Sequence, residues 1–278
     1  MRRECSGKRY TLADSVESSR IVIVGAGNLA TCLGVALRSV GINPLAVWSR
    51  TALSADTLAD KLGCETFTDI SSLPDADIVI TAVSDDALPD VAKMVAKRYP
   101  DSIVAHTAGS VPVDIWPEAA ARHYGVFYPM QTFSKTKSVD FSKVGIFVEG
   151  SDETVCGQLE NLARRLSPMV YRINGRQRAY LHIAAVFACN FVNAMYAMSA
   201  EILGNQGLPF EIMHTLIDET AAKIHTLSPA EAQTGPARRR DETIIERQRA
   251  MLTGEYKEIY DLVTRYIISK ADEIRNTK

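Results

Sequence analysis

Three small residues near the start of the chain have a spacing that suits an anion. Gly25, Gly27 and Ala30 fit the pattern G-x-G-x-x-A, directly after the apolar run 21–24 and at the start of a helical pattern. Gly25 permits a sharp turn, Gly27 has no Cβ and lets a pyrophosphate approach the backbone, and Ala30 lets helix and strand pack closely. The free N–H groups of the helix then face the anion. A glycine turn without a nucleotide is the alternative, but this context favours nucleotide binding.

The next apolar run, residues 45–48, ends in Ser49-Arg50-Thr51. An NAD site usually has Asp or Glu at this strand end, where the carboxylate binds the ribose 2′-OH, and no carboxylate is present here. A guanidinium between two hydroxyls suits a 2′-phosphate, because Arg makes charge-assisted hydrogen bonds to phosphate oxygens. An exposed loop arginine is the alternative, but the position of Arg50 favours NADP(H).

A third loop closes the apolar run 77–83. Ligands of such sheets lie across the carboxyl ends of the strands, so the backbone at 82–84 is expected to line the cofactor site. Asp85 and Asp86 are at least as consistent with capping the following helix. The predicted cofactor-binding residues are Gly25, Ala26, Gly27, Asn28, Leu29, Ser49, Arg50, Thr51, Ala82, Val83 and Ser84.

Polar residues also follow the next two apolar runs. His106, Gly109 and Ser110 come at the end of the run 102–106, and Gln131 with Thr132 comes after the run 125–129. At the carboxyl ends of strands these groups could hold a polar substrate beside a nicotinamide. The alternative is a loop with a partly buried histidine and a serine that caps a helix.

The stretch 180–203 is apolar nearly all round, which predicts a central buried helix. It contains His182, Asn190 and Asn193, which share one broad side at about 100° per residue. Buried polar groups need partners, so hydrogen bonds between helices explain each residue alone. Taken together, the three residues are predicted to face a cleft between domains, with His182 as a proton donor.

The run TGPARRRD, residues 234–241, combines a Gly-Pro turn, three arginines and a capping Asp. A solvated basic helix start is the simpler interpretation. The alternative is that one arginine binds an anionic group of the substrate or cofactor, across a dimer interface.

These residues must be positioned by two different kinds of structure. From residue 20 to about 150, short apolar β-rich runs alternate with helical patterns, which predicts a doubly wound parallel sheet. After residue 150 the pattern is nearly all helical, with one short strand, a capping-box start at Ser228 and an N-cap at Asp241. The predicted organisation is a polar tail at 1–19, a Rossmann domain at 20–150 and a helical domain at 151–278. The fold class is therefore α/β with an all-helical C-terminal domain.

Composition excludes several kinds of function. The 278 residues carry a net charge of −2, which gives no electrostatic reason to expect nucleic acid or an anionic membrane as a partner. No uninterrupted apolar run reaches about 18 residues, so no membrane helix is predicted. The five cysteines are scattered, without a C-x-x-C motif, which favours neither disulfides nor a metal site. Reduced thiols and a cytoplasmic location are expected.

The motifs together resemble a known family. The segments VGAGNLA, WSRT, HTAGS, YPMQTFS, HIAAVFACNF and LSPAEAQTGPARRRD are similar to those of Rossmann-like proteins with a C-terminal DUF2520 domain. This family has the same plan as pyrroline-5-carboxylate reductase, coenzyme F420-dependent NADP reductase and the β-hydroxyacid dehydrogenases. The resemblance implies an NADP-dependent oxidoreductase that dimerises through its helical domain, and it matches Arg239 to the family's arginine.

The chain also departs from these relatives. Tyr128 stands where the family often has His, and Arg240 stands where a small residue is usual. The β-hydroxyacid dehydrogenases have a catalytic Lys four residues before an Asn, but Val186 and Cys189 occupy the two corresponding places here. Their mechanism is therefore not carried over.

The expected function is an NADP(H)-dependent oxidoreductase that moves hydride to or from a small C=O or C=N substrate at the cleft between domains. His182, Asn190, Ser110 and His106 are the predicted catalytic residues. Gly109, Gln131, Thr132, Asn193 and Arg239 are predicted to bind the substrate, and Arg239 would suit an anionic one. No metal is expected. In either case a homodimer is expected; the alternative function is a non-catalytic NADP(H)-binding sensor or regulatory protein, which the missing Lys and Tyr128 both favour. A methyltransferase fits less well, because S-adenosylmethionine has no 2′-phosphate for Arg50.

Overall fold

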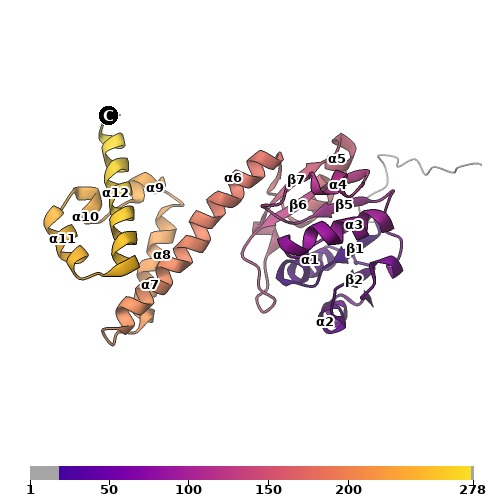
Figure 1. Ribbon diagram of the computed structural model, residues 1–278, viewed down its shortest axis with the longest axis horizontal. Helices are drawn as coiled ribbons and strands as arrows, with labels where there is room; N and C mark the ends of the chain where they lie inside the picture. Colours follow the sequence, from indigo (N-terminus) through magenta and orange to yellow (C-terminus); the bar gives the residue numbers. More distant parts are fainter. Residues whose placement is uncertain (1–18, 277–278) are drawn as a thin grey trace, which may run out of the picture. The chain divides into compact units, whose positions relative to one another are not determined.

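The chain folds into two compact units. The computed structural model describes residues 19–276, so Cys5 and nearly all of the expected tail at 1–19 lie outside the described residues. The first unit ends at Ala185 and the second begins at Val186. Figure 1 shows a sheet with helices in the first unit and helices alone in the second.

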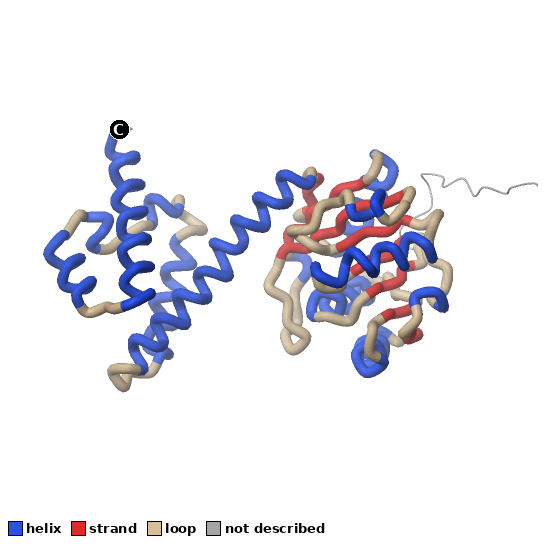
Figure 2. The backbone as a smooth tube through the Cα atoms, in the orientation of Figure 1, coloured by secondary structure: helices blue, strands red, loops and turns tan. Residues whose placement is uncertain are grey.

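A sheet of eight strands forms the first unit within the described residues. The strands are β1 (Ile21–Val24), β2 (Ala46–Trp48), β3 (Glu65–Phe67), β4 (Ile78–Thr81), β5 (Ile103–His106), β6 (His123–Met130), β7 (Gly145–Gly150) and β8 (Val170–Arg172). Their order is β3-β2-β1-β4-β5-β6-β7-β8, and Figure 2 shows them in red. The first six strands pair in parallel, as expected of a doubly wound fold.

Two features of the sheet were not predicted. The short strand β3 is too polar to stand out as an apolar run. β7 pairs antiparallel with β6, because the connection between them carries only a three-residue 3₁₀ helix, Phe141–Lys143. Parallel neighbours are usually joined by a crossover that contains an α-helix.

Helices cover both faces of the sheet. They are α1 (Asn28–Ser39), α2 (Ala52–Leu62), α3 (Leu88–Arg98), α4 (Ile115–Glu118) and α5 (Glu153–Leu166), and α6 (Gly175–Ala185) follows β8 without joining either core cluster. In β1, Ile21 and Ile23 pack with residues of α1, α2 and α5, whereas Val22 and Val24 pack with residues of α3 and α4. All four side chains are fully buried, which explains the continuous apolar run.

The division between the units falls later than the boundary expected at residue 150. α5 buries Val155, Leu159 and Leu162 in the same core as the sheet, and β8 pairs with β7. An amphipathic helix next to an apolar strand completes the sheet rather than opening a helical domain. The segment 151–185 therefore belongs to the first unit.

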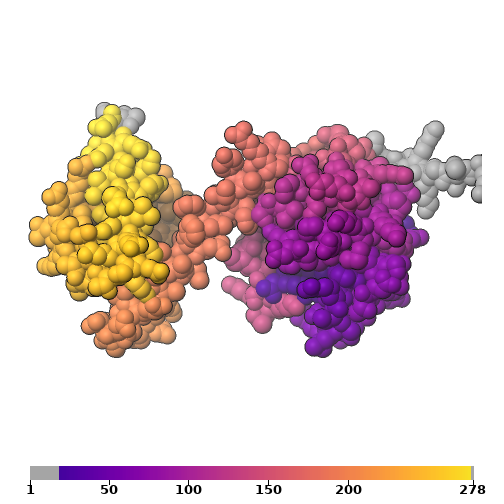
Figure 3. All heavy atoms as spheres, viewed as in Figure 1, coloured from indigo at the N-terminus to yellow at the C-terminus, as the bar shows by residue number. Residues whose placement is uncertain are grey.

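Helical segments make up the described part of the second unit. They are the π-helical segment Val186–Phe191, α7 (Val192–Gly204), the 3₁₀ helix Phe210–Met213, α8 (His214–Lys223), α9 (Pro229–Ala232), α10 (Pro236–Arg239), α11 (Glu242–Ala250) and α12 (Gly254–Asn276). Figure 3 shows α12 in yellow over much of the visible face of this unit. The capping box at Ser228 and the N-cap at Asp241 are confirmed.

The expectation of a buried central helix at 180–203 is wrong for the single chain. Tyr180 is 63% exposed, and Phe187 and Phe191 are also exposed. Helix Gly175–Gly204 is long and apolar enough to cross a membrane, with a mean hydropathy of 1.5, although the sequence analysis expected no such helix. The core helix of a soluble protein passes the same test, because a few polar residues such as His182 hardly lower the average. Among the described residues, no side chain from Val186 to Gly204 is buried.

Candidate functional site

The glycine turn joins β1 to α1, and its two glycines have different surroundings. Gly25 has φ +123°, and a Cβ there would collide with the Ala82 carbonyl, 2.7 Å from its carbon. A Cβ on Gly27 would meet nothing within 4 Å. Gly25 is therefore required by the fold, whereas Gly27 keeps a space open. No side chain caps α1, which leaves its first N–H groups for an anion.

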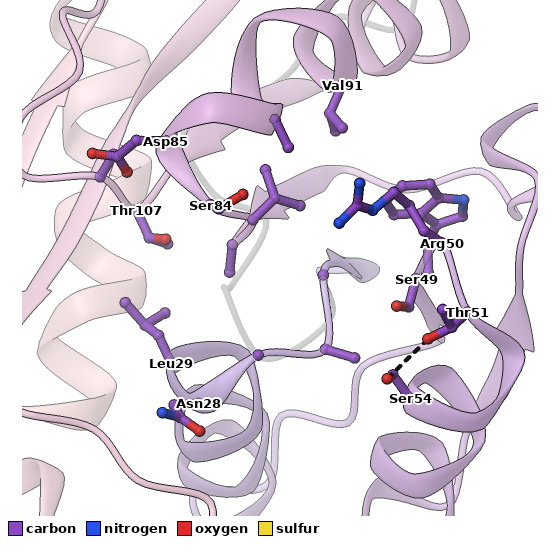
Figure 4. Close-up of a pocket in the computed structure, with 18 of the residues that line it drawn as sticks. Asn28, Leu29, Ser49, Arg50, Thr51, Ser54, Ser84, Asp85, Val91 and Thr107 are labelled. Carbon is purple, nitrogen blue, oxygen red and sulfur yellow. Dashed lines mark hydrogen bonds between the residues drawn. The ribbon is translucent and has the colours of Figure 1, made fainter.

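The loop after β2 forms a second arm of the site. Thr51 Oγ1 donates a hydrogen bond to Ser54 Oγ over 2.9 Å, and both lie with Ser49 on the same side of the opening in Figure 4. Arg50 is exposed, and its guanidinium forms no ion pair with any described residue. An uncommitted cation beside three hydroxyls fits a phosphate group.

Both arms border one cavity of about 600 Å³, which lies within the first unit. All eleven predicted cofactor-binding residues line it: Gly25, Ala26, Gly27, Asn28, Leu29, Ser49, Arg50, Thr51, Ala82, Val83 and Ser84. Gly109 and His182 line it too. This set comes from the ends of β1, β2, β4 and β5 and from α6, so the carboxyl edge of the sheet places them together.

Sequence reasoning missed several residues of the cavity. Ser54, Thr107 and Lys135 line it, and so does Asp85, for which a helix cap was considered at least as consistent as a ligand role. Ser54 stands one helical turn after the predicted Arg50, and Thr107 lies inside the HTAGS segment, so both could have been found. Lys135 gave no signal, because it lies in an irregular loop between β6 and β7.

His106 does not line the cavity. It is 0% exposed and stacks on Trp116 with ring centroids 6.2 Å apart. Its Nδ1 accepts a hydrogen bond from the Ala108 N–H over 3.2 Å. Burial, helped by the nearby Arg178 cation, lowers the pKa of His106 to about 3, so the ring is neutral at ordinary pH. The structure thus places His106 beneath the loop 107–110, where it shapes that loop.

Ser110 and Asp85 form a pair at the edge of the cavity. The Ser110 hydroxyl donates a short hydrogen bond to the Asp85 carboxylate, and both residues are exposed. Asp85 begins a 3₁₀ helix, Asp85–Ala87, before α3. The hydroxyl of Ser110 is therefore engaged with a neighbouring acid in this arrangement.

His182 reaches the cavity from α6. Its Nδ1 lies 3.2 Å from the Tyr128 hydroxyl, and the two rings meet edge to face. Burial raises the pKa of Tyr128 above its ordinary value. Gly109 fits between them, since a Cβ there would lie 2.7 Å from His182 Nδ1.

A buried ion pair fixes the start of α6. Arg178 is 1% exposed and pairs with Glu149 of β7, and its guanidinium also donates to the Val111 carbonyl over 2.7 Å. The same Glu149 accepts from the Gly175 N–H over 3.0 Å. One carboxylate thus holds both the first residue of α6 and an arginine one helical turn before His182.

The other predicted residues are not part of this cavity. Gln131 and Thr132 are exposed and bond to each other, with 2.8 Å from the Thr132 N–H to Gln131 Oε1. Asn190, Asn193 and Arg239 belong to the second unit, where each has an exposed side chain. The π-helical segment separates His182 from Asn193, so a count at α-helical spacing does not hold across it.

Comparison with known proteins finds one family match in each half of the chain, and the second match begins well before the division at Ala185. Residues 144–267 match a domain of unknown function, DUF2520, and residues 9–123 match the shikimate/quinate 5-dehydrogenase domain family. A crystal structure from Bacteroides fragilis, provisionally named an NADP oxidoreductase, is 43% identical with a TM-score of 0.85. The match covers 92% of this chain and 100% of that one. This chain belongs to the Rossmann-like, DUF2520-domain family.

Other structures share the fold of this DUF2520 protein. A protein from Thermotoga maritima is 23% identical over 92% of this chain and 99% of that one, with a TM-score of 0.71. A reductive aminase from Aspergillus terreus, in complex with NADPH and ethyl-5-oxohexanoate, is 16% identical over 92% and 99%, with a TM-score of 0.69. The sequence matches none of the curated proteins with which it was compared.

Proposed function

We propose that this DUF2520 protein is an NADP(H)-dependent oxidoreductase that transfers hydride to or from a small substrate with a C=O or C=N bond. One observation carries the proposal: a bare glycine turn and an uncommitted arginine border the same cavity. The 43% identical relative named as an NADP oxidoreductase supports the same reaction class.

The cofactor is NADP(H). The open space at Gly27 and the uncapped start of α1 fit its pyrophosphate. Arg50, with Ser49, Thr51 and Ser54 beside it, fits the 2′-phosphate. When bound, the cofactor supplies the hydride.

We place the substrate-binding residues of the first unit in the part of the cavity away from Arg50 and the residues beside it. His182 would donate a hydrogen bond to the oxygen or anionic group of the substrate. Gly109 leaves room there, and the Ser110–Asp85 pair borders the space. Asn190, Asn193 and Arg239 remain proposed substrate or catalytic residues on the second unit.

A homodimer is proposed through the helical unit, because the exposed apolar residues at 180–203 need a cover. A cytoplasmic location is proposed as well. Cys32, Cys64, Cys156 and Cys189 are all free thiols, which suits a reducing compartment.

Titration of the purified protein with NADPH and NADH tests the cofactor assignment. Trp48 borders the cavity, so its fluorescence and that of the nicotinamide give two signals. Arg50→Ala should weaken NADPH binding about 100-fold, or about 2.7 kcal/mol, and leave NADH binding nearly unchanged. Arg122→Ala removes an exposed arginine paired with Asp101 and serves as the control. Equal binding of both nucleotides by the native protein would contradict the assignment.

Turnover tests the reaction. The protein should oxidise NADPH in the presence of a member of a panel of keto acids and cyclic imines. His182→Ala should then lower turnover and keep NADPH affinity. Tight NADPH binding without turnover of any panel member would instead indicate a sensor.

A further inference from the structure

Three elements of the first unit bring Tyr128, Gly109 and His182 together at the edge of the cavity. Tyr128 is on β6, Gly109 follows β5, and His182 is on α6. Gly109 and His182 line the cavity, whereas Tyr128 is 8% exposed and lies behind them. Tyr128 can therefore act on the cavity only through a neighbour.

The position of the shared proton follows from the partners of the two groups. The Tyr128 hydroxyl and His182 Nδ1 lie 3.2 Å apart, and neither atom has another hydrogen-bond partner among the described residues. If Nδ1 donated to Tyr128, the buried hydroxyl proton would have no acceptor. If Tyr128 donates, both the hydroxyl proton and the Nδ1 lone pair are satisfied, and a partly buried pair prefers this state.

The chemical state of Tyr128 agrees with this direction. Burial raises the pKa of its hydroxyl, so the side chain stays protonated and keeps a proton to donate. With Nδ1 as the acceptor, a neutral His182 must carry its proton on Nε2. His182 then offers an N–H donor, rather than a basic lone pair, to the cavity.

Two packing features hold the pair at this distance. Arg178, one turn before His182, is fixed by Glu149 and the Val111 carbonyl, so α6 cannot rotate freely about its axis. A Cβ on Gly109 would lie 2.7 Å from His182 Nδ1 and 2.9 Å from the Tyr128 hydroxyl oxygen. Only glycine leaves room for the contact between them.

We propose that Tyr128 is a positioning residue that fixes His182 as the Nε2–H tautomer and thereby makes it a hydrogen-bond donor toward a bound substrate. The substrate group that faces His182 is then an acceptor, such as a carbonyl oxygen or a carboxylate. The proposal rests on the proposed function for the identity of the site, but the tautomer is a property of the protein itself.

The tautomer can be measured directly in the full-length protein. Long-range ¹H–¹⁵N spectra of ¹⁵N-histidine-labelled protein distinguish a protonated ring nitrogen from an unprotonated one, and His182→Gln assigns the signal. The spectra should be taken well above the ordinary histidine pKa of about 6.5. The native protein should show His182 with Nε2 protonated and Nδ1 unprotonated. A proton on Nδ1 overturns the proposal.

Tyr128→Phe removes the donor and keeps the ring. It should produce a mixture of His182 tautomers, lower kcat about tenfold or more, and leave NADPH affinity unchanged. Tyr124→Phe is the matched control on the same strand, because the Tyr124 hydroxyl has no hydrogen bond within the described residues. His182 signals in Tyr128→Phe that equal those of the native protein overturn the proposal.

Gly109→Ala tests the same pair without removing either partner. The added Cβ should separate Tyr128 from His182 and produce the same tautomer mixture, and the double variant with Tyr128→Phe should be no worse than either single variant. If the two substitutions lower kcat by fully additive amounts, the Tyr128–His182 contact is not what both of them disrupt. If the protein transfers hydride to or from no substrate, the proposed function fails, yet the His182 spectra still decide this inference.

Discussion

The two units of this protein differ in how far their apolar side chains are buried. In the first unit, β1 buries all four of its side chains, and α1, α2 and α5 bury their apolar sides against the sheet. In the described part of the second unit, the buried apolar residues are Ala237, Ile245 and Ala271. Large side chains of that unit, such as Phe187, Phe191 and Ile202, are exposed.

This difference shows that apolar composition does not by itself tell where a core lies. A doubly wound sheet receives its cover from its own crossover helices, so the first unit is complete within one chain. Burying an exposed Phe or Ile side chain is worth about 1.5–3 kcal/mol, which the single chain does not gain in its second unit. A second copy of the same chain is the cover proposed here.

The largest expected effect concerns the two glycines of the turn. Gly25→Ala should destabilise the first unit by about 3 kcal/mol or more, because the added Cβ meets the Ala82 backbone at positive φ. Gly27→Ala should fold normally and lose most NADPH binding, since its Cβ would occupy the open space. Thermal unfolding and NADPH titration of both variants measure this contrast.

The two glycine variants are expected to lose different properties: Gly25→Ala should lose stability, whereas Gly27→Ala should lose NADPH binding. A Gly27→Ala protein that unfolds early, or a Gly25→Ala protein as stable as the native one, would show that the roles are not divided in this way. Gly41→Ala is a useful reference, because Gly41 also has a positive φ but no neighbour within 4 Å of its Cβ.

The next largest effect is expected for self-association, in which a second copy of the chain would cover the exposed apolar residues of the second unit. Phe191→Asp and Ile202→Asp each place a charge on the exposed apolar part of the helical unit. Each should weaken self-association more than 100-fold, about 3 kcal/mol, because a charge in an interface core loses its hydration. Light scattering across a range of concentrations measures the change in mass.

Leu53→Asp is the matched control for this experiment. Leu53 is 80% exposed on α2 in the first unit, where no cover is proposed. The native protein should be a dimer, and this variant should remain one. A native protein that is monomeric at every concentration would contradict the proposed dimer.

The smallest expected effect concerns His106, a buried polar group in the self-contained unit. Its pKa is about 3 in the folded protein and about 6.5 when unfolded, so the unfolded chain takes up the proton first. Stability should therefore fall as the pH drops below about 6.5, by about 2 kcal/mol at pH 5 from this residue. Urea unfolding of the native protein and of His106→Asn, at pH 7.5 and at pH 5, measures this change in the free energy of unfolding.

In the His106→Asn variant this part of the pH dependence of the free energy of unfolding should be absent, whatever the stability of the variant at neutral pH. His123→Asn, a change at a half-exposed residue of β6, should keep the native dependence. If His106→Asn and the native protein show parallel stability curves between pH 7.5 and 5, the burial of His106 does not contribute as described.

Much of the first unit could be predicted from the sequence because its signals are local. The run Ile-Val-Ile-Val before Gly25 indicates a buried strand, and the position of Arg50 follows from strand order alone. These patterns predicted the alternation of strands and helices after residue 20 and eleven of the residues that line the cavity. Lys135 was missed because its place depends on the path of an irregular loop, which no periodicity reports.

The errors of the sequence analysis arise where burial is decided by distant parts of the chain. His106 was expected to act on substrate because it ends a strand, yet Trp116 and Ala108 enclose it. The stretch 180–203 was expected to be buried because it is apolar, yet all of its side chains are half-buried or exposed in the structure. A π-helical segment also interrupts the helical spacing, and residue types alone do not reveal it.

The close approach at Gly109 has a consequence for how relatives of this protein can diverge. A side chain can appear at position 109 only after the residue at 128 or 182 has become smaller, because a Cβ at 109 would overlap the side chains of Tyr128 and His182. Mutations at these sites are thus ordered in evolutionary time. In an alignment of the family, the residue at 109 should change together with those at 128 and 182, and sequences that keep both rings should keep the glycine.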